Sequence, residues 1–311
     1  MIRLICILFG FLTSQFAIAA PRPDPVAIVK SVLATPDGRL DYLEAQIAFD
    51  RLFDSAADPI AMRKMIDRLV MAARGFAGNR PSDGAKFDAI RRAVYISGPW
   101  NDNRPFAYDH DDPKGQRAGS QRLSNYLRTR RGNCVSMPIL LLIIANKMGM
   151  NINLAAAPLH LFIRYTLPTT GQTYNIEATN GGNFTRDIWY RQNFSISDRA
   201  LESGIYMRAL TKRESVATMA NKVVETLIDQ GAYEKAVELS DAILKINPRE
   251  AHAMLKRGSA IGHMIRVEFT DRFPHLALIP PVLQPRYKWL ISENARMFAQ
   301  AEALGWVEER G

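Results

Sequence analysis

The segment from Val135 to Met148 is apolar on almost every side. A helix without a polar face has to be surrounded by other elements, so this segment predicts the central helix of a buried core. Asn133 or Ser136 could cap its N-terminus, and Pro138 is tolerated only when the helix begins just before it. Gly149 suits the left-handed residue that ends many helices. The rest of the chain must therefore pack around this helix.

Either capping choice places Cys134 at the N-terminus of the predicted helix. The helix dipole and the neighbouring arginines favour the thiolate, which is the reactive form of cysteine. Backbone N–H groups at the same terminus could form an oxyanion hole. Asn133 and Arg131 are the candidate supporting residues beside it.

Two strands are predicted after the helix, Leu159 to Leu167 and Thr173 to Thr179. Alternation places His160 on one face of the first strand, and Asn175 and Glu177 on one face of the second. If the strands pair through a two-residue turn, His160 lies opposite the last residue of the second strand. Glu177 then lies two residues along on the same face, within reach of the imidazole. A turn of odd length would place this carboxylate on the other face.

The order thiol, imidazole, carboxylate is the order that a cysteine nucleophile needs. Cys134 would attack, His160 would take the thiol proton, and Glu177 would hold the imidazole in the right tautomer. Asn175, on the same face as Glu177, is a further candidate supporting residue. The alternative is that His160, beside Leu159, is an ordinary core residue.

The first 20 residues are predicted to be a signal peptide. A short positive start is followed by the mostly apolar stretch Leu4 to Phe16 and by small residues, with cleavage expected near Ala19 or Ala20. An uncleaved anchor is the alternative, but prolines follow at once and no later segment is long enough to span a membrane. Cys6 would leave with the signal, so Cys134 would be the sole cysteine of the mature chain. Such a thiol is a buried hydrophobe, an intermolecular link or a reactive group.

Composition is that of an ordinary globular protein, with 47% hydrophobic and 23% charged residues. The formal charge of +9 would allow adhesion to anionic envelope polymers or lipid surfaces. The basic residues are dispersed in pairs typical of solvated helix faces, so no nucleic-acid partner is expected.

Three helices, Asp41 to Phe53, Pro59 to Phe76 and Ala85 to Ile96, are predicted before the central stretch from their apolar periodicity. The polar segment Gly98 to Gly119 is predicted to be a loop over the site. Its run Asp109-His110-Asp111 raises the alternative of a metal site. Consecutive side chains on an extended chain point to opposite faces, so turn chemistry is the favoured interpretation and no metal is assigned.

The chain beyond Gly204 is predicted to be helical. The run from Gln230 to Ala236, followed by Ile246-Asn247-Pro248, resembles one tetratricopeptide repeat. A second pair of helices is predicted from Ala251 and a last helix from Tyr287 to Leu304. These helices would be either a plain appendage or a partner-binding groove.

Four stretches together resemble bacterial transglutaminase-like proteins of the Sir-B type. They are Leu123–Leu127, Arg130–Pro138, Ala157–Arg164 and Asn175–Gly182. The resemblance implies a papain-like α+β core, with Cys134 at the position of the nucleophile, His160 at that of the general base and Glu177 at that of the orienting acid. The tryptophan that follows the cysteine in true transglutaminases is Val135 here, which leaves the side-chain oxyanion partner open.

The predicted fold class is α+β, with a papain/transglutaminase-like core between two helical parts. The predicted parts are a signal peptide at 1–20, an N-terminal helical segment at 21–97, the core at 98–204 and a helical tetratricopeptide-like region at 205–311.

The predicted function is that of an exported cysteine enzyme attacking an amide or ester carbonyl, with water or an amine as acceptor and no cofactor. A protein or peptide substrate is expected, a protein partner could bind the C-terminal helices, and no transmembrane segment would remain after cleavage of the signal. The alternative is a non-catalytic binding module that uses the cleft and the repeat-like helices.

Overall fold

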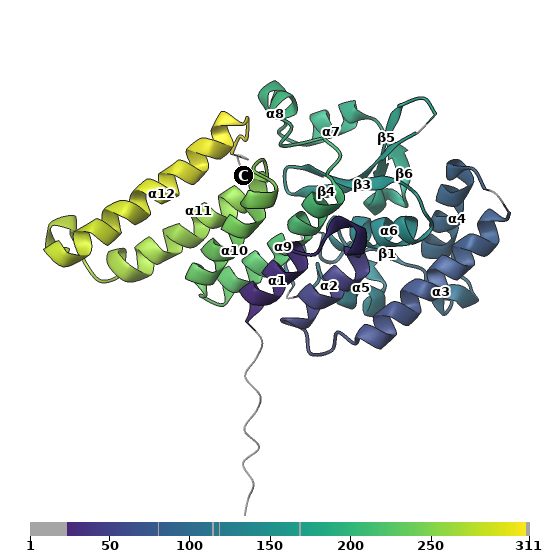
Figure 1. Ribbon diagram of the computed structural model, residues 1–311, viewed down its shortest axis with the longest axis horizontal. Helices are drawn as coiled ribbons and strands as arrows, with labels where there is room; N and C mark the ends of the chain where they lie inside the picture. The colour runs from purple at the N-terminus through teal and green to yellow at the C-terminus, as the bar shows by residue number, and fades with distance from the viewer. Residues whose placement is uncertain (1–23, 80, 114, 118, 168, 309–311) are drawn as a thin grey trace, which may run out of the picture.

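The computed structural model describes residues 24–308 except 80, 114, 118 and 168 (Figure 1). The predicted signal peptide lies outside the described residues. Within the described part, no helix is both long and apolar enough to cross a membrane.

The core contains a four-stranded antiparallel sheet in which neighbours in sequence are neighbours in space. Its strands are β3 (Ile152–Ala157), β4 (His160–Thr166), β5 (Thr173–Glu177) and β6 (Asn183–Thr185). A separate parallel pair joins β1 (Ala107–Tyr108) to β2 (Arg131–Gly132), just before the cysteine.

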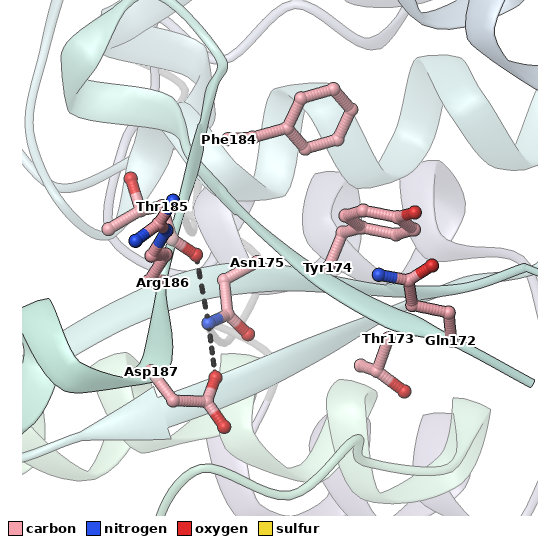
Figure 2. A pocket seen from close by; sticks show the side chains of 8 residues that line it. All are labelled: Gln172, Thr173, Tyr174, Asn175, Phe184, Thr185, Arg186 and Asp187. Atoms are coloured by element: carbon pink, nitrogen blue, oxygen red, sulfur yellow. Dashed lines mark hydrogen bonds between the residues drawn. The ribbon is translucent and has the colours of Figure 1, made fainter.

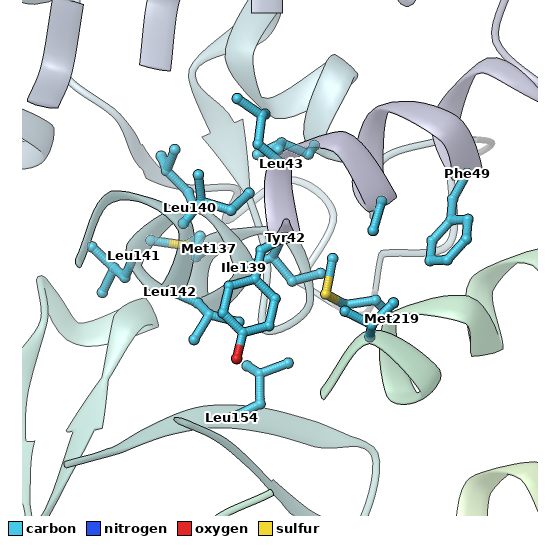
Figure 3. Packing of buried hydrophobic residues seen from close by; sticks show 14 of the residues in the cluster. Tyr42, Leu43, Phe49, Met137, Ile139, Leu140, Leu141, Leu142, Leu154 and Met219 are labelled. Atoms are coloured by element: carbon cyan, nitrogen blue, oxygen red, sulfur yellow. The ribbon is translucent and has the colours of Figure 1, made fainter. Parts of the chain in front are cut away.

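The apolar segment forms α6 (Ser136–Lys147), whose first ten residues are all buried. The helix packs against one sheet face, which contributes Leu154, Ile163 and Ile176 to the same core. Figure 3 shows the other side of the helix, where side chains of α2 (Tyr42–Arg51) and of α9 (Lys212–Asp229) lie close by. The predicted central helix is confirmed.

The opposite sheet face carries a smaller apolar cluster. Ala155 and Phe162 pack there against Tyr190 of α7 (Asp187–Asn193) and Ala200 of α8 (Asp198–Ser203). The sheet is therefore covered on both faces, by α6 on one and by the α7–α8 segment on the other (Figure 1).

The three predicted N-terminal helices are present. They are α2, α3 (Pro59–Ala77) and α4 (Asp83–Tyr95), and Asp58 caps α3 as its sequence indicates. Before α6, two described helices had no prediction, α1 (Pro25–Leu33) and the short α5 (Leu123–Thr129).

The segment between α4 and α5 is largely irregular, apart from a 3-10 turn over Pro99–Asn101 and strand β1. Asp109 accepts the backbone N–H of Asp111, and Asp112 accepts those of Gln116 and Arg117. These carboxylates therefore organise turns. No group of three or more metal-binding side chains is found among the residues that the structure describes.

The C-terminal region is a series of antiparallel helices. After α9 come α10 (Tyr233–Ile246), α11 (Ala251–Ile265) and α12 (Gln284–Ala303), separated before α12 by short turns over Arg266–Thr270, Leu276–Leu278 and Pro281–Leu283. Ala236 is fully buried and belongs to the same core as α6 and α9. The α11–α12 hairpin extends away from the sheet (Figure 1). The assignment of a tetratricopeptide repeat and the domain limits stay predictions.

Candidate active site

Cys134 lies two residues before the first residue of α6, and Asn133 caps the start of this helix. The Asn133 Oδ1 accepts the N–H groups of Val135 at 3.1 Å and of Ser136 at 3.3 Å. The hydroxyl of Ser136 accepts the Asn133 N–H at 3.2 Å. The Met137 N–H donates to the Asn133 carbonyl, a backbone hydrogen bond of helical spacing, so Cys134 lies within the first turn. Both capping candidates are thus used, and Cys134 occupies the helix terminus.

Gly132 permits this arrangement because no side chain fits at its position. A Cβ atom there would lie 2.6 Å from the ring of Tyr126 and 2.8 Å from the Ser136 Oγ. Tyr126 is fully buried, so its ring has little room to move. A glycine before Asn133 is therefore a steric requirement.

The strand register brings the imidazole and the carboxylate to the same end of the sheet. Arg164 pairs with Asn175 and Thr166 with Thr173, the register expected for a two-residue turn. The connection is longer, because the Leu167 N–H donates to the Gln172 carbonyl and the Gly171 N–H donates to Leu167. The parity is nevertheless even, so His160 and Glu177 share one face.

The imidazole of His160 meets Glu177 directly. Its Nε2 lies 2.8 Å from Oε2 of the carboxylate, and both side chains are largely buried. Oε1 of Glu177 accepts the Thr179 N–H at 3.0 Å and the Thr179 hydroxyl at 2.5 Å. The Tyr190 hydroxyl donates to Oε2 at 2.9 Å. Both oxygens of the Glu177 carboxylate are therefore fixed by hydrogen bonds.

The thiol of Cys134 is half-buried and free of disulfides. It also lies 3.7 Å from the carbonyl of Leu159, the residue before His160. Since Nε2 of His160 faces Glu177, Nδ1 is the nitrogen left for the thiol, and the interaction with Cys134 helps to raise the pKa of His160. The three predicted residues are brought together in the order thiol, imidazole, carboxylate.

Electrostatics favour a charged pair at this site. Burial disfavours the imidazolium, but hydrogen bonds and charge from Cys134 and Glu177 outweigh it and raise the pKa of His160 to about 9. Burial also opposes the carboxylate, yet the interactions with His160 and Thr179 lower the pKa of Glu177. The imidazole is therefore protonated, and the carboxylate ionised, at neutral pH.

The three predicted supporting residues have different surroundings. Asn133 is buried and its amide oxygen caps the helix, as described above. Arg131 is exposed and contributes its backbone to β2. The Asn175 Nδ2 donates to the Thr185 carbonyl at 3.1 Å and to Asp187 at 2.5 Å. Asn175 thus ties β5 to β6 and to the start of α7.

A cavity of about 450 Å³ lies beside these Asn175 contacts (Figure 2). It opens where β6 ends and the chain turns toward α7. Its lining residues are Gln172, Thr173, Tyr174, Asn175, Phe184, Thr185, Arg186 and Asp187. None of the Cys134, His160 and Glu177 side chains lines it, so the candidate active site is not this cavity.

Sequence reasoning did not identify Tyr190 or Tyr108. Tyr190 lies on α7 and reaches Glu177 from outside the two strands. Tyr108 lies in β1 opposite Gly132, and the charges of Cys134 and Glu177 add to burial in raising its pKa. No periodic pattern links either tyrosine to the predicted triad, since each comes from a separate element.

The sequence profile of the transglutaminase-like superfamily matches residues 60–221, about half of the chain. The chain therefore belongs to the transglutaminase-like superfamily. The mixed α/β core and the helical C-terminal region agree with the predicted fold class.

Relatives of known sequence point to the Sir-B type within this superfamily. The chain is 24% identical over 139 residues to the protein SirB1 of Salmonella typhimurium. It is 25% identical over 143 residues to the UPF0162 protein YchA of Escherichia coli, and 28% identical over 143 residues to a UPF0162 protein of Buchnera aphidicola. Each match covers 44% of this chain, which spans about half the length of the relatives, at 51%. No solved structure matches the chain significantly.

Proposed function

We propose that this protein is an exported transglutaminase-like cysteine enzyme that acts on an amide or ester carbonyl through a thioester on Cys134. The observation that carries the proposal is the contact of 2.8 Å between His160 Nε2 and Glu177 Oε2, which leaves the other imidazole nitrogen for the thiol. Export rests on the sequence of residues 1–20 alone.

In the first half of the reaction, the sulfur of Cys134 attacks the carbonyl carbon while His160 holds the thiol proton. The tetrahedral intermediate collapses as its C–N or C–O bond breaks, and the leaving amine or alcohol takes the proton from His160. A thioester remains. Glu177 keeps the imidazole oriented and stabilises its positive charge throughout.

In the second half, water or an amine attacks the thioester and gives a proton to His160. The C–S bond breaks, and the thiolate is released beside the protonated imidazole, which restores the starting state. Water as acceptor gives a peptidase or amidase, and an amine gives a transamidase.

The backbone at Cys134 supplies the oxyanion donor in this proposal. Asn133 Oδ1 already accepts the Val135 and Ser136 N–H groups. The Cys134 N–H donates to no other group among the described residues, so it is free to bind a developing oxyanion. A backbone donor would not depend on a tryptophan in place of Val135.

The test is the pH dependence of alkylation of Cys134 by iodoacetamide in the full chain. An ordinary cysteine has a pKa of about 8.5 and reacts slowly at pH 6 to 7. We expect fast alkylation in that range for the wild type and an ordinary profile for His160→Ala. Trapping of an acyl-enzyme from envelope extract would then identify substrates. Alkylation with an ordinary profile that is indifferent to His160→Ala would overturn the proposal.

The competing function is a non-catalytic binding module. The observation in its favour is that a cavity of about 450 Å³ lies at Asn175 and Asp187, away from the thiol. A protein partner whose binding is unaffected by Cys134→Ala, with ordinary alkylation of Cys134, would support it.

A further inference from the structure

We propose that Leu159 and Trp189 select a substrate with a large apolar side chain next to the attacked carbonyl. This inference rests on the proposed function, because it assigns the acyl-side substrate contacts of the same thiol. The two residues lie on separate segments: Leu159 precedes His160 in the chain, and Trp189 is near Phe194, whose ring lies beside His160.

Leu159 occupies a turn that does not suit leucine. Ala157 pairs with His160, so the β3–β4 connection is the two-residue turn Pro158-Leu159. Proline fixes the first turn position, and Leu159 has a φ of +53° at the second. That left-handed conformation favours glycine or asparagine and costs other residues about 1–2 kcal/mol.

The Leu159 side chain does not pack in the core, so burial does not offset this conformational cost. It is 70% exposed, more than most large apolar residues of the described chain. Its carbonyl lies 3.7 Å from the thiol sulfur of Cys134, and the next residue is His160. A strained, exposed leucine beside the reacting atoms is accounted for by a contact made only when substrate is bound.

A second apolar group flanks the imidazole. The ring of Phe194 lies 4.9 Å from that of His160, and the ring of Trp189 lies 6.0 Å from Phe194. Trp189 is 39% exposed, and its neighbour Ile188 is exposed too. On α7 only Tyr190 is buried, and Ile188 and Trp189 are the exposed apolar residues of this helix.

The surroundings of His160 should favour apolar over charged side chains of the substrate. A leucine or phenylalanine side chain of the substrate would lose water against Leu159 and Trp189 and gain free energy. A charged side chain would lose its hydration there, and the aromatic and aliphatic groups next to His160 offer it no hydrogen-bond partner. We therefore expect a preference of about tenfold or more for the apolar side chain.

The experiment measures the rate of covalent modification of Cys134 in the full chain by peptide vinyl sulfones. The reagents differ only in the residue next to the electrophile, which is leucine, phenylalanine, glutamate or lysine. Each rate is divided by the rate with iodoacetamide on the same variant, which corrects for changes in the thiol itself. For the wild type, the leucine and phenylalanine reagents should exceed the charged ones by about tenfold or more.

Two variants test the named contacts. Leu159→Asn keeps a residue that tolerates the left-handed turn, so its melting temperature should be equal or higher, while its normalised preference for leucine should fall several-fold. Trp189→Ala should also reduce the preference. Ile60→Ala, at a site on α3 that is 75% exposed, is the matched control and should keep the wild-type preference.

The outcomes separate the two proposals. Ordinary iodoacetamide reactivity overturns the proposed function. Enhanced iodoacetamide reactivity with no preference among the reagents, or with a preference untouched by both variants, overturns the inference alone.

Discussion

Tyr190 and His160 bind the same oxygen of Glu177. The Tyr190 hydroxyl donates to Oε2 at 2.9 Å, and Nε2 of His160 lies 2.8 Å from that atom. Thr179 holds the other oxygen with its N–H and hydroxyl. A carboxylate with three donors and an imidazolium around it stays ionised although it is buried, because hydrogen bonds to the charged form outweigh the loss of hydration.

Replacement of Tyr190 by phenylalanine should weaken the proposed reaction without changing its substrates. The substitution keeps the ring that stacks on Phe162 at 4.2 Å and removes one donor to Glu177. A hydrogen bond to a charged group contributes about 1.5–3 kcal/mol, so we expect a loss of about tenfold or more in the rate of acylation.

A pH profile distinguishes this positioning role of Tyr190 from a merely structural one. With one donor fewer, the pKa of Glu177 rises, so the acid limb of the pH–rate profile should move to higher pH. A lower rate with an unmoved acid limb would contradict the role of Tyr190. Trp189→Phe, on the adjacent exposed position of α7, is the control for the acid limb and should leave it in place.

Replacement of Glu177 by glutamine should lower the pKa of His160. Without the carboxylate, burial of the imidazole is opposed only by Cys134, so the pKa should fall below the present value of about 9. We expect the acylation rate to decrease by about 10²–10⁴-fold, because the orienting charge is lost. Titration of the imidazole by NMR measures the first effect, and an unchanged pKa would refute the charged pair.

The His160–Glu177 pair also predicts the direction in which the stability of the fold changes with pH. The folded pKa of His160, about 9, is above the unfolded value of about 6.5, so the stabilisation is complete below pH 6.5 and is lost as pH rises through 9. The Glu177→Gln variant lacks most of this dependence. Urea unfolding of both proteins from pH 6 to 10 should therefore show curves that converge at high pH.

The parts of the fold that could be predicted were those that a single segment determines. The apolar sequence of α6 leaves no polar face, so its burial followed from its composition. The register of β4 and β5 was expected only on the condition of an even connection, which alternation alone does not decide, and the structure has that register. The two-residue turn assumed in that condition is shorter than the observed connection, but the observed loop is also even and preserves the same parity.

The features of the site that the sequence analysis did not predict depend on contacts between distant segments. Tyr190 reaches Glu177 only because α7 covers the sheet, and this packing leaves no trace in local periodicity. Asn175 shares a face with Glu177, as alternation requires, but its amide is bound by Thr185 and Asp187. A face assignment gives the direction of a side chain and does not give its partners.

Replacement of Gly132 by alanine should impair both the fold and the thiol. The added Cβ would meet the Tyr126 ring at 2.6 Å, and overpacking of this kind costs about 1–3 kcal/mol. The same atom would press on the Ser136 Oγ and disturb the helix start, so alkylation of Cys134 should slow. Gly84→Ala on α4 is the control, because its Cβ meets nothing closer than 3.9 Å and should stabilise the helix.

The last prediction concerns Asp50, a buried carboxyl of α2 that caps α5. Its Oδ2 accepts the Ser124 N–H at 2.7 Å, and its Oδ1 accepts the Gln46 amide at 2.7 Å. Burial raises the pKa of Asp50 to about 6. Because the folded state holds this proton more tightly than the unfolded state, stability falls as pH rises from about 4 to about 6.

Replacement of Asp50 by asparagine should remove this fall. The Gln46 Oε1 has no partner among the described residues. After a flip of the Gln46 amide, this oxygen could accept a hydrogen bond from the amide nitrogen introduced at position 50. The amide oxygen introduced there would still accept the Ser124 N–H. Urea unfolding from pH 4 to 7 should show the wild type losing about 2–3 kcal/mol relative to the Asp50→Asn variant. Asp54→Asn, at the half-buried carboxyl that accepts the Ser124 hydroxyl, is the control. Parallel curves for the wild type and Asp50→Asn would show that the Asp50 carboxyl is as well solvated in the folded state as in the unfolded chain.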